Sequence, residues 1–529
     1  MTPLILALGL LAPTPALACG GFFCDGFSAP IDQAAERIVF AVDPDAGEVT
    51  AHVQITYVGE AHDFAWVVPV AAVPELFLSN DAVFTTLANA TIPTYRLGFD
   101  ETGVCEVGLV QSESMLIFDE ASPSAGVTVV ATQAVGPYDT VTLKAESAEL
   151  LVDWLQAENY EVPDTLDAAL APYVAADQYF VALRLQSDKS TGDLAPLGMT
   201  YPGTQASIPI QLTSIAAAPD MPLQVYVLGP SRAVPDNYLH VQINEAAIDW
   251  YGGGTNYREV VSRAADEAGG QAFATDFAGP ADTFRGTLWS TDRLNLDALR
   301  TIDTPAEWLN QVVFTVPASS QLTALLTTLV PPPAGVDAAT FLQCPSCFEV
   351  SVPGWDPAAA TLALQEGILT PLLRAQAMID GASRITRLSS SMDAAEMTVD
   401  PVFVFNAELP QDATNQHTAT NVLHCGFFEG FDHGERSLVL EDGREFRLPS
   451  TAWMRRRGET EAAYLAEVAS PAALVIEDLG GEGLGEVLFD YREQASDDAR
   501  QVGRGCDSNG VPTGAGALFA LVALARRRR

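Results

Sequence analysis

The sequence predicts an α+β fold with a β-rich N-terminal part, a helical middle segment and a β-rich C-terminal part. Two observations support this: apolar and polar residues alternate with period 2 near both ends, and apolar residues in the middle recur at helical spacing. Strands and helices do not follow one another in a regular βαβ rhythm, which argues against a parallel α/β fold. With 529 residues, 48% of them hydrophobic, the chain has ample material for about two to four domains.

The predicted segments differ in composition and pattern. They are a signal peptide (1–18), a β-rich α+β domain (19–280), a mainly helical segment (281–385), a β-rich C-terminal part (386–500) and a C-terminal sorting tag with a short hydrophobic segment (501–529).

Strands dominate the first part of the mature chain. They are predicted at 37–42, 49–57, 64–70, 127–132 and 140–144. Residues 43–47 form a hairpin turn, and Asp43 and Asp45 are assigned to that turn because the other ligands of a calcium loop are missing. His52 lies on the polar face of its strand, where solvation accounts for it.

Helices enter behind capping residues. Ser147 is expected to cap one helix, and Asn256 a second that ends at Gly269 and Gly270. Gly252–Gly254 precede this second helix and could offer N–H groups to an anion, but no lysine follows at the spacing of a phosphate loop, so a flexible turn is the prediction. Further strands are predicted at 179–185, 224–228 and 240–243.

The middle segment has helical character up to about Asp380, and Asp356 with Pro357 begins one of its helices. The β pattern then returns. Strands are predicted at 402–405, 437–440, 445–448, 473–476 and 486–489.

The charge balance excludes one class of partner. The formal net charge is −41, which repels phosphate backbones, so we expect no nucleic-acid binding. Divalent-cation binding is the alternative to simple solubility in salty medium, but the acidic residues are scattered along the whole chain, which favours solubility.

The cysteines predict disulfides. Cys506 belongs to the tag, and six others remain as candidates: Cys19, Cys24, Cys105, Cys344, Cys347 and Cys425. Short spacings permit local closure of Cys19 with Cys24 and of Cys344 with Cys347. Cys105 and Cys425 would then remain. We interpret Cys344-x-x-Cys347 as a structural disulfide, since the residues after it do not read as the helix that a redox thiolate needs.

A group of metal-ligating residue types occurs near the C-terminal strands: His417, His424, Cys425, Asp432 and His433. Zinc is one interpretation, but no metal motif accompanies these residues, and an odd spacing would place His417 and His424 on opposite faces of a shared strand. We assign no catalytic, cofactor-binding or metal-ligating residue from the sequence and expect no cofactor.

The N-terminus has the pattern of a secretory signal, in which an apolar stretch precedes Ala16-Leu17-Ala18. Cleavage after Ala18 would make Cys19 the first mature residue, and lipidation of Cys19 is an alternative fate of this end.

The C-terminus combines Cys506 in a polar spacer, an apolar run from Gly514 to Ala525, and Arg526–Arg529. This pattern resembles the MYXO-CTERM tag of myxobacterial surface proteins. The resemblance implies cleavage near Cys506 by a sorting protease and delivery to the cell surface. An ordinary single-pass anchor is the alternative.

Several segments resemble an exported bacterial family catalogued as domain of unknown function 2330. They are Cys19–Cys24, Ile31–Gln33, Phe64–Val70, Asn256–Gly270 and Met397–Phe403. The resemblance implies no known activity and no catalytic residues.

The sequence therefore predicts an exported, surface-anchored protein of unknown biochemical activity, structural or binding in role, with an unidentified surface or envelope partner. The cell surface or outer membrane is the expected location, with the periplasm or release into the medium as alternatives. A secreted hydrolase with a site assembled from distant residues is the alternative function. A deep pocket with converging acids and a histidine would favour it.

Overall fold

The computed structural model describes residues 32–58, 65–102, 128–158, 165–186, 195–215, 217–424, 435–448, 460–469, 471–481 and 483–496. The predicted signal peptide, the sorting tag, and Cys19, Cys24, Cys105, Cys425 and Cys506 lie outside these residues.

Strands and helices both contribute heavily, which confirms the α+β class and the helical middle. The strands are β1 (Asp32–Asp43), β2 (Glu48–Val58), β3 (Ala65–Val70), β4 (Glu75–Leu78), β5 (Thr94–Thr102), β6 (Thr128–Val135), β7 (Tyr138–Lys144), β8 (Tyr179–Leu185), β9 (Leu197–Pro202), β10 (Ala206–Ser207), β11 (Met221–Gly229), β12 (Ala233–Pro235), β13 (Leu239–Ile243), β14 (Ala272–Pro280), β15 (Arg384–Met392), β16 (Val402–Phe405), β17 (Gln416–His424), β18 (Glu435–Leu440), β19 (Glu445–Leu448), β20 (Ala473–Asp478) and β21 (Glu486–Asp490).

The helices are α1 (Asp81–Thr91), α2 (Ala148–Ala157), α3 (Leu166–Ala175), α4 (Ile210–Thr213), α5 (Tyr257–Glu267), α6 (Leu296–Leu299), α7 (Pro305–Val313), α8 (Ser320–Leu329), α9 (Ala338–Gln343), α10 (Pro357–Leu364), α11 (Thr370–Gly381) and α13 (Glu461–Val468). Short helical turns add η3 (Glu245–Ala247), η4 (Ala281–Phe284), η5 (Pro345–Cys347) and η6 (Gln365–Leu369).

A ten-stranded sheet organises the molecule, in the order β21-β20-β13-β14-β15-β11-β1-β2-β9-β4. Smaller sheets have the orders β19-β18-β17-β5, β3-β8-β7-β6 and β10-β16-β12. Strands from both β-rich parts share the large sheet, where β14 pairs with β15, and β5 pairs with β17 in a small sheet. The predicted domain boundaries remain a prediction, but the two β-rich parts are built into common sheets.

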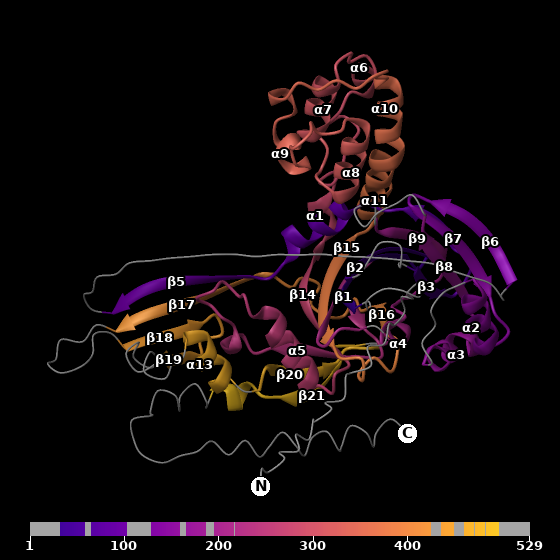
Figure 1. Ribbon diagram of the computed structural model, residues 1–529. Helices are drawn as coiled ribbons and strands as arrows, with labels where there is room; N and C mark the ends of the chain where they lie inside the picture. The colour runs from indigo at the N-terminus through magenta and orange to yellow at the C-terminus, as the bar shows by residue number, and fades with distance from the viewer. Residues whose placement is uncertain are drawn as a thin grey trace, which may run out of the picture.

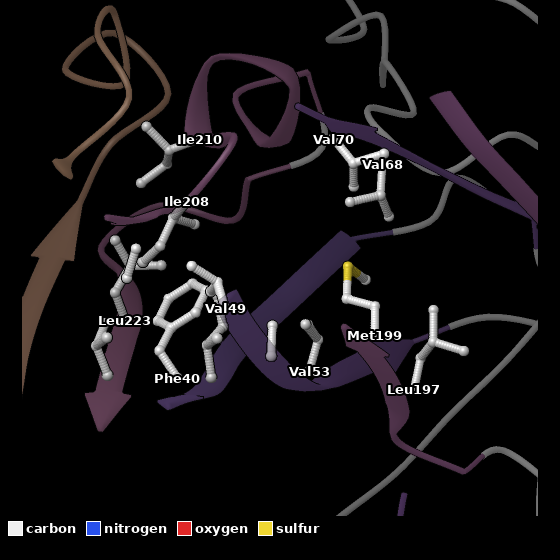
Figure 2. Packing of buried hydrophobic residues seen from close by; sticks show 14 of the residues in the cluster. Phe40, Val49, Val53, Val68, Val70, Leu197, Met199, Ile208, Ile210 and Leu223 are labelled. Carbon is white, nitrogen blue, oxygen red and sulfur yellow. The ribbon is translucent and has the colours of Figure 1, made fainter. Parts of the chain in front are cut away.

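The central strands of the large sheet are buried on both faces. On β1, Ile38 and Phe40 point toward the β3-β8 sheet, and Val39 between them points toward the helices of the middle segment. Figure 2 shows Phe40, Val49 and Leu223 packed in the first of these clusters. The helices α6–α10 stand as a group to one side of the sheet, and α2 and α3 lie near the β7-β8 sheet (Figure 1).

The predicted helix starts are partly confirmed. The side chains of Ser147 and Asp356 accept hydrogen bonds from the first turns of α2 and α10. Asn256 precedes α5 as predicted but does not cap it with its side chain. Its amide instead accepts from the backbone N–H of Asp249 and donates to the carbonyl of Ala247, which fixes the preceding loop.

The prediction for His52 is wrong. Its side chain is fully buried, because the face of β2 that looked polar in the sequence is covered in the fold. The Nδ1 atom lies 2.6 Å from the hydroxyl of Ser79, and the ring meets Phe77 edge-on. Burial, assisted by the positive charge of Arg374, lowers the pKa of His52 from 6.5 to about 3.

His52 should make the fold sensitive to acid. The unfolded chain takes up a proton near pH 6.5, whereas His52 in the folded chain does so only near pH 3. Stability is therefore full above pH 6.5 and falls as the pH drops toward 3, by about 2 kcal/mol at pH 5. Urea unfolding of wild type and of His52→Gln at pH 7.5 and pH 5 measures this difference.

The variant should show a smaller pH dependence than wild type, although its absolute stability is also lower. Equal pH dependence in wild type and His52→Gln would contradict the assignment.

Candidate functional site

A cavity of about 680 Å³ lies where β13, β14 and β20 of the large sheet approach β5, β17 and the turn between β18 and β19. Its charged and polar lining comes from segments far apart in the chain: Tyr95, Arg232, His240, Gln242, Glu245, Tyr257, Thr275, Asp276, His417, Glu441, Asp442, Arg444 and Glu477. Apolar residues complete it, among them Leu409, Pro410, Leu479 and Leu484.

Three of these residues form a hydrogen-bonded chain across adjacent strands. The Nδ1 atom of His240 lies 2.9 Å from a carboxylate oxygen of Glu477, and its Nε2 atom lies 2.8 Å from the hydroxyl of Thr275. The order β20-β13-β14 places them side by side, since His240 pairs directly with Glu477 and also with Phe273, two residues before Thr275. All three side chains therefore lie on one face of the sheet.

The donor and acceptor roles of the three groups determine which atoms carry protons. Burial would raise the pKa of Glu477, but the hydrogen bonds from His240 and Gln242 outweigh it and lower that pKa, so the group is an ionised acceptor. Nδ1 of His240 must then carry a proton and Nε2 must accept one, so the hydroxyl of Thr275 donates to Nε2. Burial lowers the pKa of His240, which keeps its ring neutral at pH 7.

Arg232 completes the arrangement on the far side of Thr275. Its Nη2 atom donates to the threonine hydroxyl over 3.2 Å, and its Nη1 atom donates to the carbonyl of Pro410 over 3.1 Å. The hydroxyl of Thr275 thus accepts from a cation and donates to a neutral histidine.

Irregular strand pairing surrounds the site. The register shifts between Thr275 and Phe277 on β14, between Gln242 and Ile243 on β13, and between Ile476 and Glu477 on β20. A bulge bends its strand and re-aims the neighbouring side chains, and bulges are frequent beside functional sites.

Asp276, the extra residue of the β14 bulge, is also among the residues that line the cavity. Its side chain is inaccessible to solvent and lies 2.8 Å from Nε of Arg387, which is also buried. The hydroxyls of Tyr257 and Ser389 each donate to its carboxylate over 2.5 Å. Burial raises the pKa of Asp276, and the Arg387 charge with these two hydrogen bonds opposes that rise.

Another part of the lining is built around Tyr95. The ring of His417 stacks on it at 4.8 Å, and Nδ1 of His417 lies 2.7 Å from Glu245. The Tyr95 hydroxyl is buried and finds no hydrogen-bond partner among the described residues. Burial raises the pKa of Tyr95, so this hydroxyl keeps its proton.

Of the residues singled out in the sequence, His417 lines the cavity, whereas Cys425, Asp432 and His433 lie outside the described residues. Cys344 and Cys347 form the predicted disulfide, with Cα atoms 5.4 Å apart, between α9 and η5. His424 lies on β17 with His417 but contacts Ser437 and Glu445 on the other face. The described part of the chain contains no group of three or more metal-ligating side chains. Nor does any helix in it have the length and apolarity needed to cross a membrane.

The sequence missed the histidine chain because each member looks ordinary in its own strand. His240 stands beside the apolar Leu239 and Val241, and Glu477 is one of 68 acidic residues. A lone histidine within an apolar strand was the one available signal.

The buried ion pair should carry much of the local stability. Asp276→Asn leaves the Arg387 charge buried and unpaired, which should lower the free energy of unfolding by about 3–5 kcal/mol. Glu75→Gln breaks the exposed pair with Arg374 and should cost less than about 1 kcal/mol. Chemical denaturation measures both, and equal losses would show that Asp276 does not compensate a buried charge.

Comparison with known proteins identifies a family but no function. No curated protein matches the chain, and no solved structure does. A family model described as an uncharacterized protein conserved in bacteria (DUF2330) matches residues 13–287, about half of the sequence. His240 and Thr275 fall inside the matched region, whereas Glu477 and the resembling segment Met397–Phe403 lie beyond it. The chain belongs to the DUF2330 family of uncharacterized bacterial proteins.

Proposed function

We propose that this protein is exported to the cell surface and binds a small polar molecule, uncharged or cationic, in the cavity between the sheets. The observation that carries the proposal is the cavity itself. Its volume of about 680 Å³ lies within the range of small-molecule sites, and polar groups converge on it from separate strands.

The charge of the lining defines the ligand class. Five carboxylates line the cavity, against two arginines and two histidines. Arg444 is paired with Asp442, and Asp276 with Arg387, which leaves Glu245, Glu441 and Glu477 against Arg232. An anion would be repelled by this surplus of acids, whereas hydroxyl or ammonium groups can donate to the carboxylates.

Sequence patterns at both ends support export. The small-x-small site before Cys19 and the tag around Cys506 are typical of a secreted precursor with a sorting protease acting at its C-terminus. The Cys344–Cys347 disulfide accords with an oxidising compartment. A surface or envelope component is the partner that these signals favour.

Ligand binding should raise the melting temperature. Sorbitol, maltose, choline and spermidine represent the favoured classes, and at least one should stabilise the protein by roughly 1–3 °C at a saturating concentration. Phosphate and citrate should produce no such rise. Ala413→Trp fills the cavity and should abolish the effect, whereas Ala359→Trp on the exposed face of α10 should preserve it.

Stabilisation by the anions alone, or an undiminished effect in Ala413→Trp, would contradict the proposed pocket.

Processing should depend on the tag. Mass spectrometry of surface-displayed protein should find Cys19 at the N-terminus and no residues of the Arg526–Arg529 block. Cys506→Ala should retain the block, while Ser508→Ala should be processed normally. Normal processing and display of Cys506→Ala would leave a plain anchor as the remaining interpretation.

A further inference from the structure

The chain Thr275–His240–Glu477 has the order of groups that nucleophilic catalysis requires: a hydroxyl, a neutral base that accepts its proton, and a carboxylate that orients the base. We infer that Thr275 is the nucleophile and His240 the general base of an esterase site in the cavity, with Glu477 as the positioning residue. This inference rests on the proposed function, since the substrate must bind in the same cavity.

The reaction balances without any added reagent. Oγ1 of Thr275 attacks the ester carbonyl carbon while its proton passes to Nε2 of His240. Collapse of the tetrahedral intermediate breaks the ester C–O bond, and the departing alcohol takes the proton from Nε2. Water then attacks the acyl-threonine, with His240 accepting its proton, and the carboxylic acid leaves as Thr275 regains its hydrogen. Glu477 stabilises the imidazolium in both halves of the cycle.

Arg232 supplies the charge that the tetrahedral intermediate needs. Its Nη2 atom is 3.2 Å from the attacking oxygen, so the carbonyl oxygen of a substrate on Thr275 comes within reach of the guanidinium. A fixed cation at the place where negative charge develops is worth more in a partly desolvated cavity than in water. The hydrogen bond from Arg232 also favours the threonine alkoxide.

The lining defines the substrate class as an ester with an apolar acyl group and a polar alcohol. The carbonyl of Pro410 accepts a hydrogen bond from Arg232, and Leu479 follows directly after β20, two residues beyond Glu477. Both residues line the cavity, so apolar surface adjoins the nucleophile. Glu245, Glu441 and Asp442 line the other part of the cavity, where the uncharged or cationic alcohol would bind.

Two measurements test the inference on the whole mature protein. The first is hydrolysis of butyrylcholine, an ester of an apolar acid and a cationic alcohol. The second is mass spectrometry after treatment with diisopropyl fluorophosphate, which should modify Thr275. Thr275→Val keeps the shape of the side chain and should lower kcat about a thousand-fold or more and abolish labelling. Thr275→Ser should retain both ester hydrolysis and labelling.

A matched control is Thr386→Val. Thr386 is a buried threonine of β15 that accepts a hydrogen bond from the N–H of Ala233 and does not line the cavity. Its loss should reduce stability without altering the rate of the folded enzyme, which circular dichroism at the assay temperature verifies.

Glu477→Gln tests whether Glu477 positions His240 for catalysis or only supports the fold. It should lower kcat about a hundred-fold or more, leave KM nearly unchanged, and move the acid limb of the pH–rate profile to lower pH, because the imidazolium loses its carboxylate. A purely structural Glu477 would leave the limb where it is.

Absence of hydrolysis and labelling in a wild-type protein that responds to the polar probes would overturn the esterase site and leave ligand binding intact. Labelling of a residue other than Thr275, or activity retained in Thr275→Val, would also overturn it. If neither probes nor ester engage the cavity, the proposed function itself fails.

Discussion

The antiparallel pairing of β14 with β15 is the contact on which the rest of the structure depends. These strands are separated in sequence by the helical middle segment, yet they are neighbours at the centre of the large sheet. Their pairing brings Asp276 against Arg387 and Ser389 and sets the register from which Thr275 reaches His240. Without it, the large sheet would divide into β21-β20-β13-β14 and β15-β11-β1-β2-β9-β4, and Asp276 would lose its contact with Arg387.

The central position of this pairing explains why ionised groups are buried there. An isolated carboxylate or guanidinium is too costly to desolvate, but Asp276 and Arg387 compensate each other and have further hydrogen-bond partners. The bulge adds Asp276 as one extra residue on β14. Its charged side chain can therefore reach Arg387 while the neighbouring residues keep their alternation between the two faces of the sheet. The buried ion pair, the bulge and the position of Thr275 therefore all depend on the same strand pairing.

Local pattern predicted most of the elements and little of the site. The alternation in 49–57 and the cap at Asp356 depend on neighbours a few residues away, so the sequence contained the whole signal. The prediction for His52 was wrong because the sequence of its strand does not show that α1 and the helices of the middle segment cover that face. The chain of Thr275, His240 and Glu477 could not be predicted because its members come from distant parts of the sequence. His240 and Glu477 are 237 residues apart, and only the sheet order makes them partners.

The helical segment leaves and re-enters the sheet at paired residues, since Pro280 lies opposite Arg384. Because its ends meet in this way, the segment can change in length without moving the strands that carry it. The match to the family model stops at residue 287, shortly after the chain leaves the sheet at the end of β14. The length of the helical segment is still limited, because Val39, Tyr226 and Leu228 pack under its helices. A chain with a shorter helical segment would have to cover the same apolar surface by other means.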